Sequence, residues 1–225
     1  MVLCAIHQPN FFPWLGYFDK MRQADVFVFL DQVDYPKSGG SMQSWCNRVK
    51  LNISGSAKWI SCPVIRQPGP QSIASVLLNN TRPWRDELRE ILKTNYGKAP
   101  NFQAVYPIIH QLLDYETETL AEFNIHAITA IMRIMKITTT LFRQSHLTLP
   151  VASGTDRLIS ICNAVGANSY LTGGGASGYQ EDERFVNAGL QVKYQQFTAQ
   201  PYGDRSRYIA GLSVIDWLMH AEEAN

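Results

Sequence analysis

One stretch decides the fold: MVLCAIHQPNFFPWLGYFDKMRQADVFVFLD, residues 1–31. Residues 2–6 are a short apolar run that ends in a proline-containing turn, which predicts a buried first strand. Residues 14–24 repeat apolar side chains at helical spacing, which predicts a helix. Residues 26–30 are apolar on both faces, as is typical of a central parallel strand. The stretch therefore predicts a strand–helix–strand unit with a right-handed crossover.

The rest of the chain alternates in the same way except in its middle. Polar residues 32–46 predict a long loop, and residues 48–53 and 58–65 predict a β-hairpin. Residues 83–135 carry apolar stripes at helical spacing and predict a helical excursion. The elements expected after it are helices over 155–165, 180–188 and 214–220 and strands over 169–172 and 190–197. Alternation at both ends predicts one α/β domain, residues 1–225, with a three-layer Rossmann-like sheet and a helical insertion.

The composition is that of an ordinary globular protein and excludes several classes. Hydrophobic residues make up 45% of the 225 residues and charged residues 17%, which rules out a mainly disordered chain. The net charge of +1 disfavours a general nucleic-acid binder, which needs a basic surface to displace counterions. No apolar run approaches the roughly 20 residues of a membrane span. Residues 1–9 lack the basic start of a signal peptide, so we expect a cytoplasmic protein.

Cysteine usage favours free thiols over disulfides or zinc ligands. Cys4, Cys46, Cys62 and Cys162 are scattered and form no paired CxxC spacing. Such cysteines are usually reduced and buried in a cytoplasmic protein. Because a four-ligand zinc site needs the paired spacing that is missing, we expect no metal site.

The first candidate segment lies between the first predicted strand and the first predicted helix. Open α/β sheets bind ligands at the carboxyl ends of their strands, and a helix start offers free N–H groups to a phosphate or carboxylate. His7 is the residue type most readily tuned for proton transfer near neutral pH, with a hydrogen-bonded core histidine as the equal alternative. The segment supplies His7 as a catalytic candidate and Gln8, Asn10, Trp14 and Tyr17 as substrate-binding candidates.

Two more catalytic candidates, Asp31 and Tyr35, follow the second predicted strand. If the sheet is parallel, Asp31 and His7 end neighbouring strands on the same edge. A carboxylate at that edge can orient an imidazole or bind a hydroxyl group. The alternative for Asp31 is a turn at the start of a loop.

A polar run before the predicted hairpin offers groups that bind an anion or a carbonyl oxygen. Arg48, the fourth catalytic candidate, carries a planar fork suited to carboxylate or phosphate, and Asn47 stands beside it. The alternative is a solvated strand face. Cys46 is a candidate nucleophile because the charges of Arg48 and Lys50 favour its thiolate, although a lone cysteine is weak evidence.

A glycine-rich turn follows the predicted strand over 169–172. Consecutive glycines can present backbone N–H groups to an anion, whereas the lysine of the GxxxxGK[ST] phosphate loop is missing here. The alternative is a sharp hinge. The substrate-binding candidates of this turn are Gly173, Gly174, Gly175, Ser177 and Tyr179.

Together these segments resemble the WbqC-like family over nearly the whole chain. The residues that carry the resemblance are His7 to Asn10, Pro13 to Phe18, Asp31, Tyr35, Asn47, Arg48, Ala167 to Gly173, Tyr179, Phe185, Gly189, Leu190 and Leu212 to Asp216. Two positions depart from the pattern: Cys46 replaces a polar or basic residue, and residues 219–221 lack an Asn-x-Gly ending. The resemblance implies a role in bacterial surface-polysaccharide or specialised-metabolite biosynthesis. It also implies acyl or aminoacyl transfer to an amine, with a carrier-protein thioester as one donor.

A second likeness concerns the nucleotidyltransferase or HUP-like folds. Residues 12–17 occupy the position of the HxGH signature of those folds, between the first strand and the first helix. Trp14 and Tyr17 stand where the signature has histidines, so the phosphate-stabilising imidazoles are missing. This difference counts against nucleotidyl transfer and leaves a related fold open.

The leading hypothesis is a transferase that forms an amide by acyl transfer to an amino group. In it His7 is the general base, Asp31 orients His7 or the acceptor, and Arg48 with Asn47 binds an oxygen. The turn over 173–175 would hold a phosphate or a phosphopantetheine arm of the substrate. The expected partners are a small-molecule amine or nucleotide-sugar and an acyl or peptidyl carrier protein.

Two alternatives stay open. One is a nucleotidylyl or adenylyl transferase that uses ATP and Mg²⁺. The other is a non-catalytic binding protein for a nucleotide-sugar or a carrier protein.

Overall fold

The computed structural model describes residues 1–36, 45–173 and 181–221, and the chain folds into two compact units. Unit 1 consists of Met1–Pro9, Gly16–Gln32 and Met132–Thr198, and unit 2 of Asn10–Leu15, Val33–Ile131 and Ala199–Asn225. The His7-to-Tyr17 motif is therefore divided between the two units, and each unit is described by itself below.

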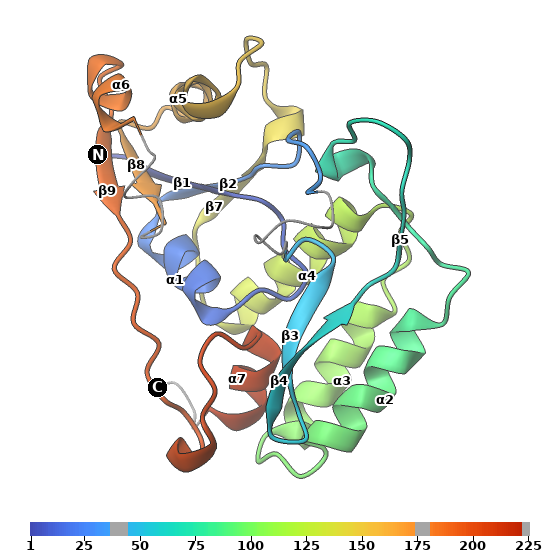
Figure 1. The fold of residues 1–225 in the computed structure, drawn as a ribbon. Coiled ribbons are helices and arrows are strands. Elements are labelled where there is room, and N and C mark those ends of the chain that lie inside the picture. Colours follow the sequence, from blue (N-terminus) through green and yellow to red (C-terminus); the bar gives the residue numbers. More distant parts are fainter. Residues whose placement is uncertain (37–44, 174–180, 222–225) are drawn as a thin grey trace. The chain divides into compact units, whose positions relative to one another are not determined.

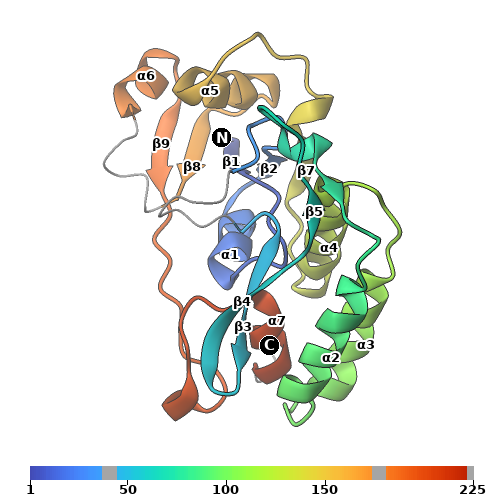
Figure 2. The same ribbon diagram turned by 45° about the vertical axis from the view of Figure 1, so that its right-hand side comes forward.

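Unit 1 is built on a parallel sheet in the order β7-β2-β1-β8-β9, which can be followed in Figure 2. The strands are β1 Leu3–His7, β2 Val26–Phe29, β7 Thr140–Arg143, β8 Ser169–Thr172 and β9 Gln191–Tyr194. β1 and β2 are parallel neighbours, with His7 opposite Phe29. The predicted strand–helix–strand unit is thus confirmed.

Helices cover both faces of this sheet (Figure 1). They are α1 Leu15–Gln23, α5 Gly154–Ala164 and α6 Asp182–Asn187. On one face Ile6 of β1 shares an apolar cluster with Cys162 of α5 and Phe185 of α6. On the other face Tyr17 of α1 packs against Phe27 of β2, with ring centroids 5.4 Å apart. The predicted three-layer, Rossmann-like α/β fold is confirmed.

The strand order reverses at β1, because the chain adds β2 and β7 on one side and β8 and β9 on the other. Pairing between β1 and β8 runs from Leu3 with Ser169 to Ala5 with Leu171, while β1 itself continues to His7. Beyond the pair of Ala5 with Leu171, β1 and β8 are no longer paired, and we call this position at the carboxyl end of the two strands the fork. Open α/β sheets bind ligands at such a reversal, outside the carboxyl ends of the strands.

β7, the edge strand that pairs with β2 through Val26 and Thr140, was not predicted from the sequence. The strand alternates between exposed and half-buried residues, so it lacks the continuous apolar run that marked the central strands. The β-branched run over 137–140 in front of it was the available signal.

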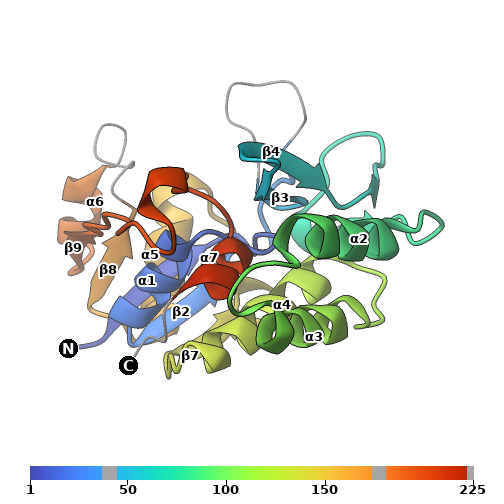
Figure 3. The ribbon, with the colours of Figure 1, turned by 90° about the horizontal axis from the view of Figure 1, so that it is seen from below.

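Unit 2 combines helices with two small antiparallel strand pairs. The elements are β3 Arg48–Ile53, β4 Ser56–Ser61, β5 Val64–Ile65, β6 Leu77–Leu78, α2 Trp84–Tyr96, α3 Phe102–Leu113 and α7 Val214–His220, and α4 Leu120–Ile134 begins here. Figure 3 shows α2 and α3 side by side. The helices expected within 83–135 are present.

The second strand of the hairpin differs from its predicted range of 58–65. It begins at Ser56 because Ser54 and Gly55 form a two-residue turn with φ angles of 52° and 80°, the left-handed pair that a tight hairpin favours. It ends at Ser61, two residues before Pro63, which has no N–H group for a strand ladder. The separate strand β5 pairs with β6 instead.

The loop over 10–15 forms the aromatic core of unit 2. Phe11 and Phe12 are fully buried, with ring centroids 5.6 and 6.0 Å from that of Phe123 in α4. Phe12 has a φ of 44°, which is rare for a bulky side chain. Ser213 Oγ holds this conformation by donating to the Phe12 carbonyl at 2.7 Å. Backbone strain of this kind concentrates at functional sites.

Replacing Phe123 by alanine will test how far unit 2 depends on this core. We expect Phe123→Ala to lower the free energy of unfolding by about 3–5 kcal/mol, because a ring in contact with Phe11, Phe12 and Trp84 leaves a cavity. Denaturant titration measures the loss. Phe142→Ala, at a residue 37% exposed, is the control and will cost much less. Equal losses for the two variants would contradict this account of the core.

Candidate functional site

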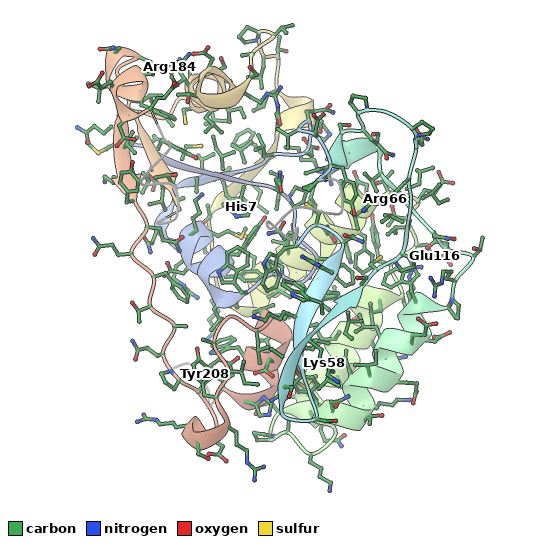
Figure 4. The ribbon with its side chains drawn as sticks, viewed as in Figure 1. His7, Lys58, Arg66, Glu116, Arg184 and Tyr208 are labelled. Atoms are coloured by element: carbon green, nitrogen blue, oxygen red, sulfur yellow. The ribbon has the colours of Figure 1, made fainter. Side chains whose placement is uncertain are left out.

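His7 is the last residue of β1 and lies at the fork, partly buried (Figure 4). Its Nδ1 is 3.1 Å from the main-chain oxygen of Gln8, an atom that only accepts hydrogen bonds. The neutral ring therefore carries its hydrogen on Nδ1 and its lone pair on Nε2. Tyr17 donates to the same oxygen at 3.1 Å, and its ring meets the imidazole edge-on at 4.8 Å. These contacts fix the tautomer and the plane of the ring.

The protonation state of His7 follows from its surroundings. Burial lowers the pKa of His7 to about 3, and the charge of Lys20 acts in the same direction. The hydrogen bond to Gln8 opposes both effects and is outweighed. At neutral pH the imidazole is therefore uncharged, and its Nε2 is an acceptor that need not first lose a proton.

Lys20 is a residue of this site that the sequence analysis missed. Its side chain is 4% exposed, and Nζ donates to the main-chain oxygen of Ile6 at 2.9 Å. Within the described ranges no carboxylate lies within ion-pair distance of this ammonium group. Burial lowers the pKa of Lys20 to about 8. The available signal was a lysine on the apolar stripe of the first predicted helix, between Tyr17 and Met21.

The hydrogen bond of Lys20 satisfies a main-chain carbonyl at the fork. Carbonyl groups of β1 point alternately to its two neighbours: that of Val2 accepts from Ser169, and that of His7 accepts from Leu30. The Ile6 carbonyl therefore faces β8, beyond the last pair of those two strands. Lys20 supplies the donor that β8 no longer provides, so a positive charge sits where the sheet opens.

Gly173 follows β8 at the same edge of the sheet and is partly buried. Its predicted role in binding an anion remains a prediction. The other candidates of the glycine turn, Gly174, Gly175, Ser177 and Tyr179, lie outside the described residues.

Asp31 lies at the edge of the sheet where it was expected, two residues beyond the end of β2, and is 2% exposed. Its carboxylate oxygens accept from Ser145, one from the main-chain N–H at 2.9 Å and one from Oγ at 2.6 Å. This carboxylate thus ties the end of β2 to the loop after β7. A role in orienting His7 or an acceptor stays a prediction.

The remaining predicted site residues belong to unit 2, where Asn10, Cys46 and Asn124 form one buried group. Cys46 Sγ donates to Asn10 Oδ1 at 3.8 Å, and Asn124 Nδ2 donates to the Cys46 carbonyl at 2.7 Å. The thiol of Cys46 is fully buried. An enclosed thiol that donates its hydrogen favours a packing role over the candidate nucleophile.

Three indoles and one guanidinium form a row of contacts within unit 2. The indole of Trp14 lies 5.0 Å from that of Trp45, which lies 4.7 Å from that of Trp59. The Arg48 guanidinium sits 4.3 Å above the Trp59 ring. Trp14 and Arg48, both predicted site residues, thus lie at the two ends of one row of contacting side chains.

Tyr35 and Asn47 complete the predicted residues of unit 2. Tyr35 is buried beneath Arg66, whose guanidinium lies 5.3 Å from its ring, and burial raises the pKa of Tyr35 to about 12. Its hydroxyl has no hydrogen-bond partner among the described residues. Asn47 donates through Nδ2 to the Cys62 carbonyl at 3.0 Å. Arg66 and Asn47 both line a cleft of about 330 Å³.

The described residues hold neither a metal-binding cluster nor a membrane-spanning helix. Within 1–36, 45–173 and 181–221, no three His, Cys, Asp or Glu side chains gather in a way that could hold a metal ion. No helix in those ranges is both long enough and apolar enough to cross a bilayer.

A parallel sheet of this order, with an imidazole and a buried ammonium at its strand reversal, defines a Rossmann-like α/β protein with a polar site at the fork. The model of the WbqC-like protein family matches residues 8–225, so the chain belongs to that family. This confirms the resemblance drawn from the sequence motifs.

The chain is similar to a protein of Mycobacterium tuberculosis, "Uncharacterized protein Rv1507c". It is 28% identical over 223 residues, which cover 96% of this chain and 92% of the relative. No solved structure matches the chain. The comparisons thus establish the family and leave the reaction to be argued from the site.

Titration of His7 will test the electrostatics of the fork. We expect its NMR signals to stay constant from neutral pH down to about pH 4 and to shift near pH 3. In Lys20→Met the pKa of His7 will rise, since a like charge is removed, and will stay below the ordinary 6.5 because burial persists. Lys50→Met in unit 2 is the control. A His7 that titrates near 6.5 in the wild type would contradict the assignment.

The lowered pKa of His7 also predicts how the stability of the protein depends on pH. Between about 6.5 and 3 the unfolded chain binds a proton at His7 and the folded chain does not, so stability falls as the pH is lowered through this window. Denaturant titrations at several pH values will show a shallower fall in His7→Gln than in the wild type. Parallel curves for the two proteins would be the contrary result.

Asp31 gives a third test. We expect Asp31→Ala to lower the free energy of unfolding by about 1–3 kcal/mol, because the two hydrogen bonds from Ser145 to this buried carboxylate are lost. Asp34→Ala, at an exposed residue, is the matched control and will change it little. Thermal and denaturant unfolding measure both. An Asp31→Ala protein as stable as the control would contradict the role described here.

Proposed function

We propose that the protein is a transferase that moves an acyl or aminoacyl group onto an amine at the fork. The observation that carries the proposal is the pairing of a neutral His7 with the buried, positively charged Lys20 at the carboxyl end of β1. Ligands of open α/β sheets bind in this position. Lys20 suits the acyl donor and His7 suits the acceptor amine.

Lys20 suits the anionic part of an acyl donor. Its ammonium has no carboxylate partner among the described residues and lies in a region of low dielectric, where a charge acts more strongly than in water. A phosphate or carboxylate placed at the fork would balance it. A phosphopantetheine arm carries such a phosphate next to its thioester, and a nucleotide-sugar also carries phosphate.

His7 suits the acceptor amine. The Nε2 lone pair can accept a hydrogen bond from an N–H group and hold the amine for attack on the thioester carbonyl. As the C–N bond forms and the C–S bond breaks, the amine proton passes through Nε2 to the leaving thiolate. With a pKa of about 3, His7 keeps this proton only during the transfer. Direct attack of this kind requires no covalent enzyme intermediate.

The nucleotidylyl transferase alternative has one observation in its favour. The order β7-β2-β1-β8-β9 is the arrangement in which dinucleotides bind at the strand reversal. A buried ammonium there would serve a triphosphate as well as a phosphopantetheine. The nucleotidylyl transferase alternative predicts release of pyrophosphate and Mg²⁺-dependent binding of ATP.

An amide-forming assay with variants will decide between these functions. A set of acyl and aminoacyl phosphopantetheine thioesters is incubated with amino sugars, and products are identified by mass spectrometry. We expect amide formation in the wild type, a fall of about 10²–10⁴-fold in kcat for His7→Gln, and near-normal activity for Cys46→Ser.

Three outcomes would count against the proposal. Loss of all activity in a folded Cys46→Ser protein would favour a covalent thioester route. Pyrophosphate release from ATP with Mg²⁺, without amide product, would favour nucleotidyl transfer. Ligand binding without any turnover would favour the non-catalytic binding protein.

A further inference from the structure

Unit 2 contains a cleft of about 840 Å³, a volume in the usual range for small-molecule sites. The residues that line it include Asn52, Tyr96, Tyr202, Tyr208, Asp216 and His220. Figure 4 shows Tyr208 beside α7, the helix that carries Asp216. None of these residues was a site candidate from the sequence.

A buried carboxylate lies in the wall of this cleft. Asp216 is 4% exposed, and it accepts from the Tyr96 hydroxyl at 2.9 Å and from the Tyr202 hydroxyl at 2.7 Å. Burial and the negative charge of Asp216 raise the pKa of both phenols, so they remain donors at neutral pH. Each carboxylate oxygen therefore keeps room for a further donor.

No lysine or arginine among the described residues forms an ion pair with this buried carboxylate. Of the described basic groups, that of His220 alone comes within ion-pair distance, with Nδ1 3.8 Å from Asp216 Oδ1. That nitrogen donates its hydrogen to the main-chain oxygen of Asp216 at 2.9 Å. Arg207, on the rim of the cleft, pairs instead with Asp204 at 3.5 Å. Buried charges in proteins are normally paired, so an open partner position indicates a missing cation.

A second observation points to the same ligand. The side-chain oxygen of Asn52 is buried and has no hydrogen-bond partner among the described residues. Asn52 adjoins the carboxylate, because its main-chain N–H donates to the Tyr96 hydroxyl at 2.9 Å and that hydroxyl donates to Asp216. One wall of the cleft thus holds an acceptor without a donor, Asn52 Oδ1, beside a carboxylate that can accept further hydrogen bonds. A primary ammonium has three N–H donors and one positive charge, and so satisfies both.

The rest of the lining suits an ammonium on a polar molecule. Tyr202 and Tyr208 meet edge to face with centroids 5.2 Å apart, and aromatic faces attract cations. Asn95, Thr94 and Ser206 add hydrogen-bonding groups for hydroxyls. We propose that this cleft binds the primary ammonium of an amino sugar, with Asp216 as its counter-ion. The proposal is independent of the transferase reaction, and its test needs no acyl donor.

Calorimetric titration with glucosamine, glucose and N-acetylglucosamine tests the proposal on the whole protein. Glucose and N-acetylglucosamine keep the ring and remove the charge, so we expect millimolar or tighter binding of glucosamine and at least about tenfold weaker binding of the two neutral sugars. Equal binding of the three sugars, or no binding of glucosamine, would overturn the proposal.

Variants identify the site. Asp216→Asn keeps the shape of the side chain and will abolish the preference for glucosamine over glucose. Tyr208→Leu, at a half-buried position, will weaken glucosamine binding several-fold and decides the matter if Asp216→Asn does not fold. Tyr194→Leu in β9 of unit 1 is the matched control and will bind as the wild type does. Wild-type affinity in folded Asp216→Asn or in Tyr208→Leu would overturn the assignment.

Discussion

The hydrogen bond from Lys20 Nζ to the Ile6 carbonyl is the interaction on which the architecture of unit 1 depends. Two parallel strands that lead to helices on opposite faces must separate, and the first carbonyl beyond their last pair then has no strand donor. A buried carbonyl without a partner is costly, so the chain brings a lysine from α1 to it. That solution leaves a positive charge inside the protein, and this charge adds to the effect of burial in lowering the pKa of His7.

The order of elements was predictable from sequence because it rests on local patterns. The strand–helix–strand start has apolar runs and helical spacing that depend on neighbouring residues, and the structure confirms it. β7 was not predictable in the same way, since an edge strand buries little on either side and its partner β2 is more than a hundred residues away in the sequence. The shorter second hairpin strand depends on the φ angles of Ser54 and Gly55, and these follow from the pairing of the two strands.

For the candidate site, too, local features were predictable from the sequence and distant contacts were not. The positions of His7 and Asp31 followed from the rule that polar residues at strand ends gather on one edge. Their partners did not: Asp31 bonds to Ser145, 114 residues away, and Tyr96 meets Asp216 across 120 residues. Whether an ionic group is buried, and what lies opposite it, is decided by such distant contacts. The burial of Lys20 and Asp216 therefore became evident only in the folded protein. For Lys20, its position on an apolar helical stripe was a signal in the sequence.

The insertion of residues 33–131 between β2 and β7 also constrains how the chain can fold during synthesis. When β1, α1 and β2 leave the ribosome, they have one another and none of the three other strands of their sheet. The ladder from Val26 to Thr140 closes a loop of more than a hundred residues, which is slow unless the intervening chain has already become compact. A growing chain thus gains by folding the inserted segment first, which shortens the search of β7 for its place beside β2.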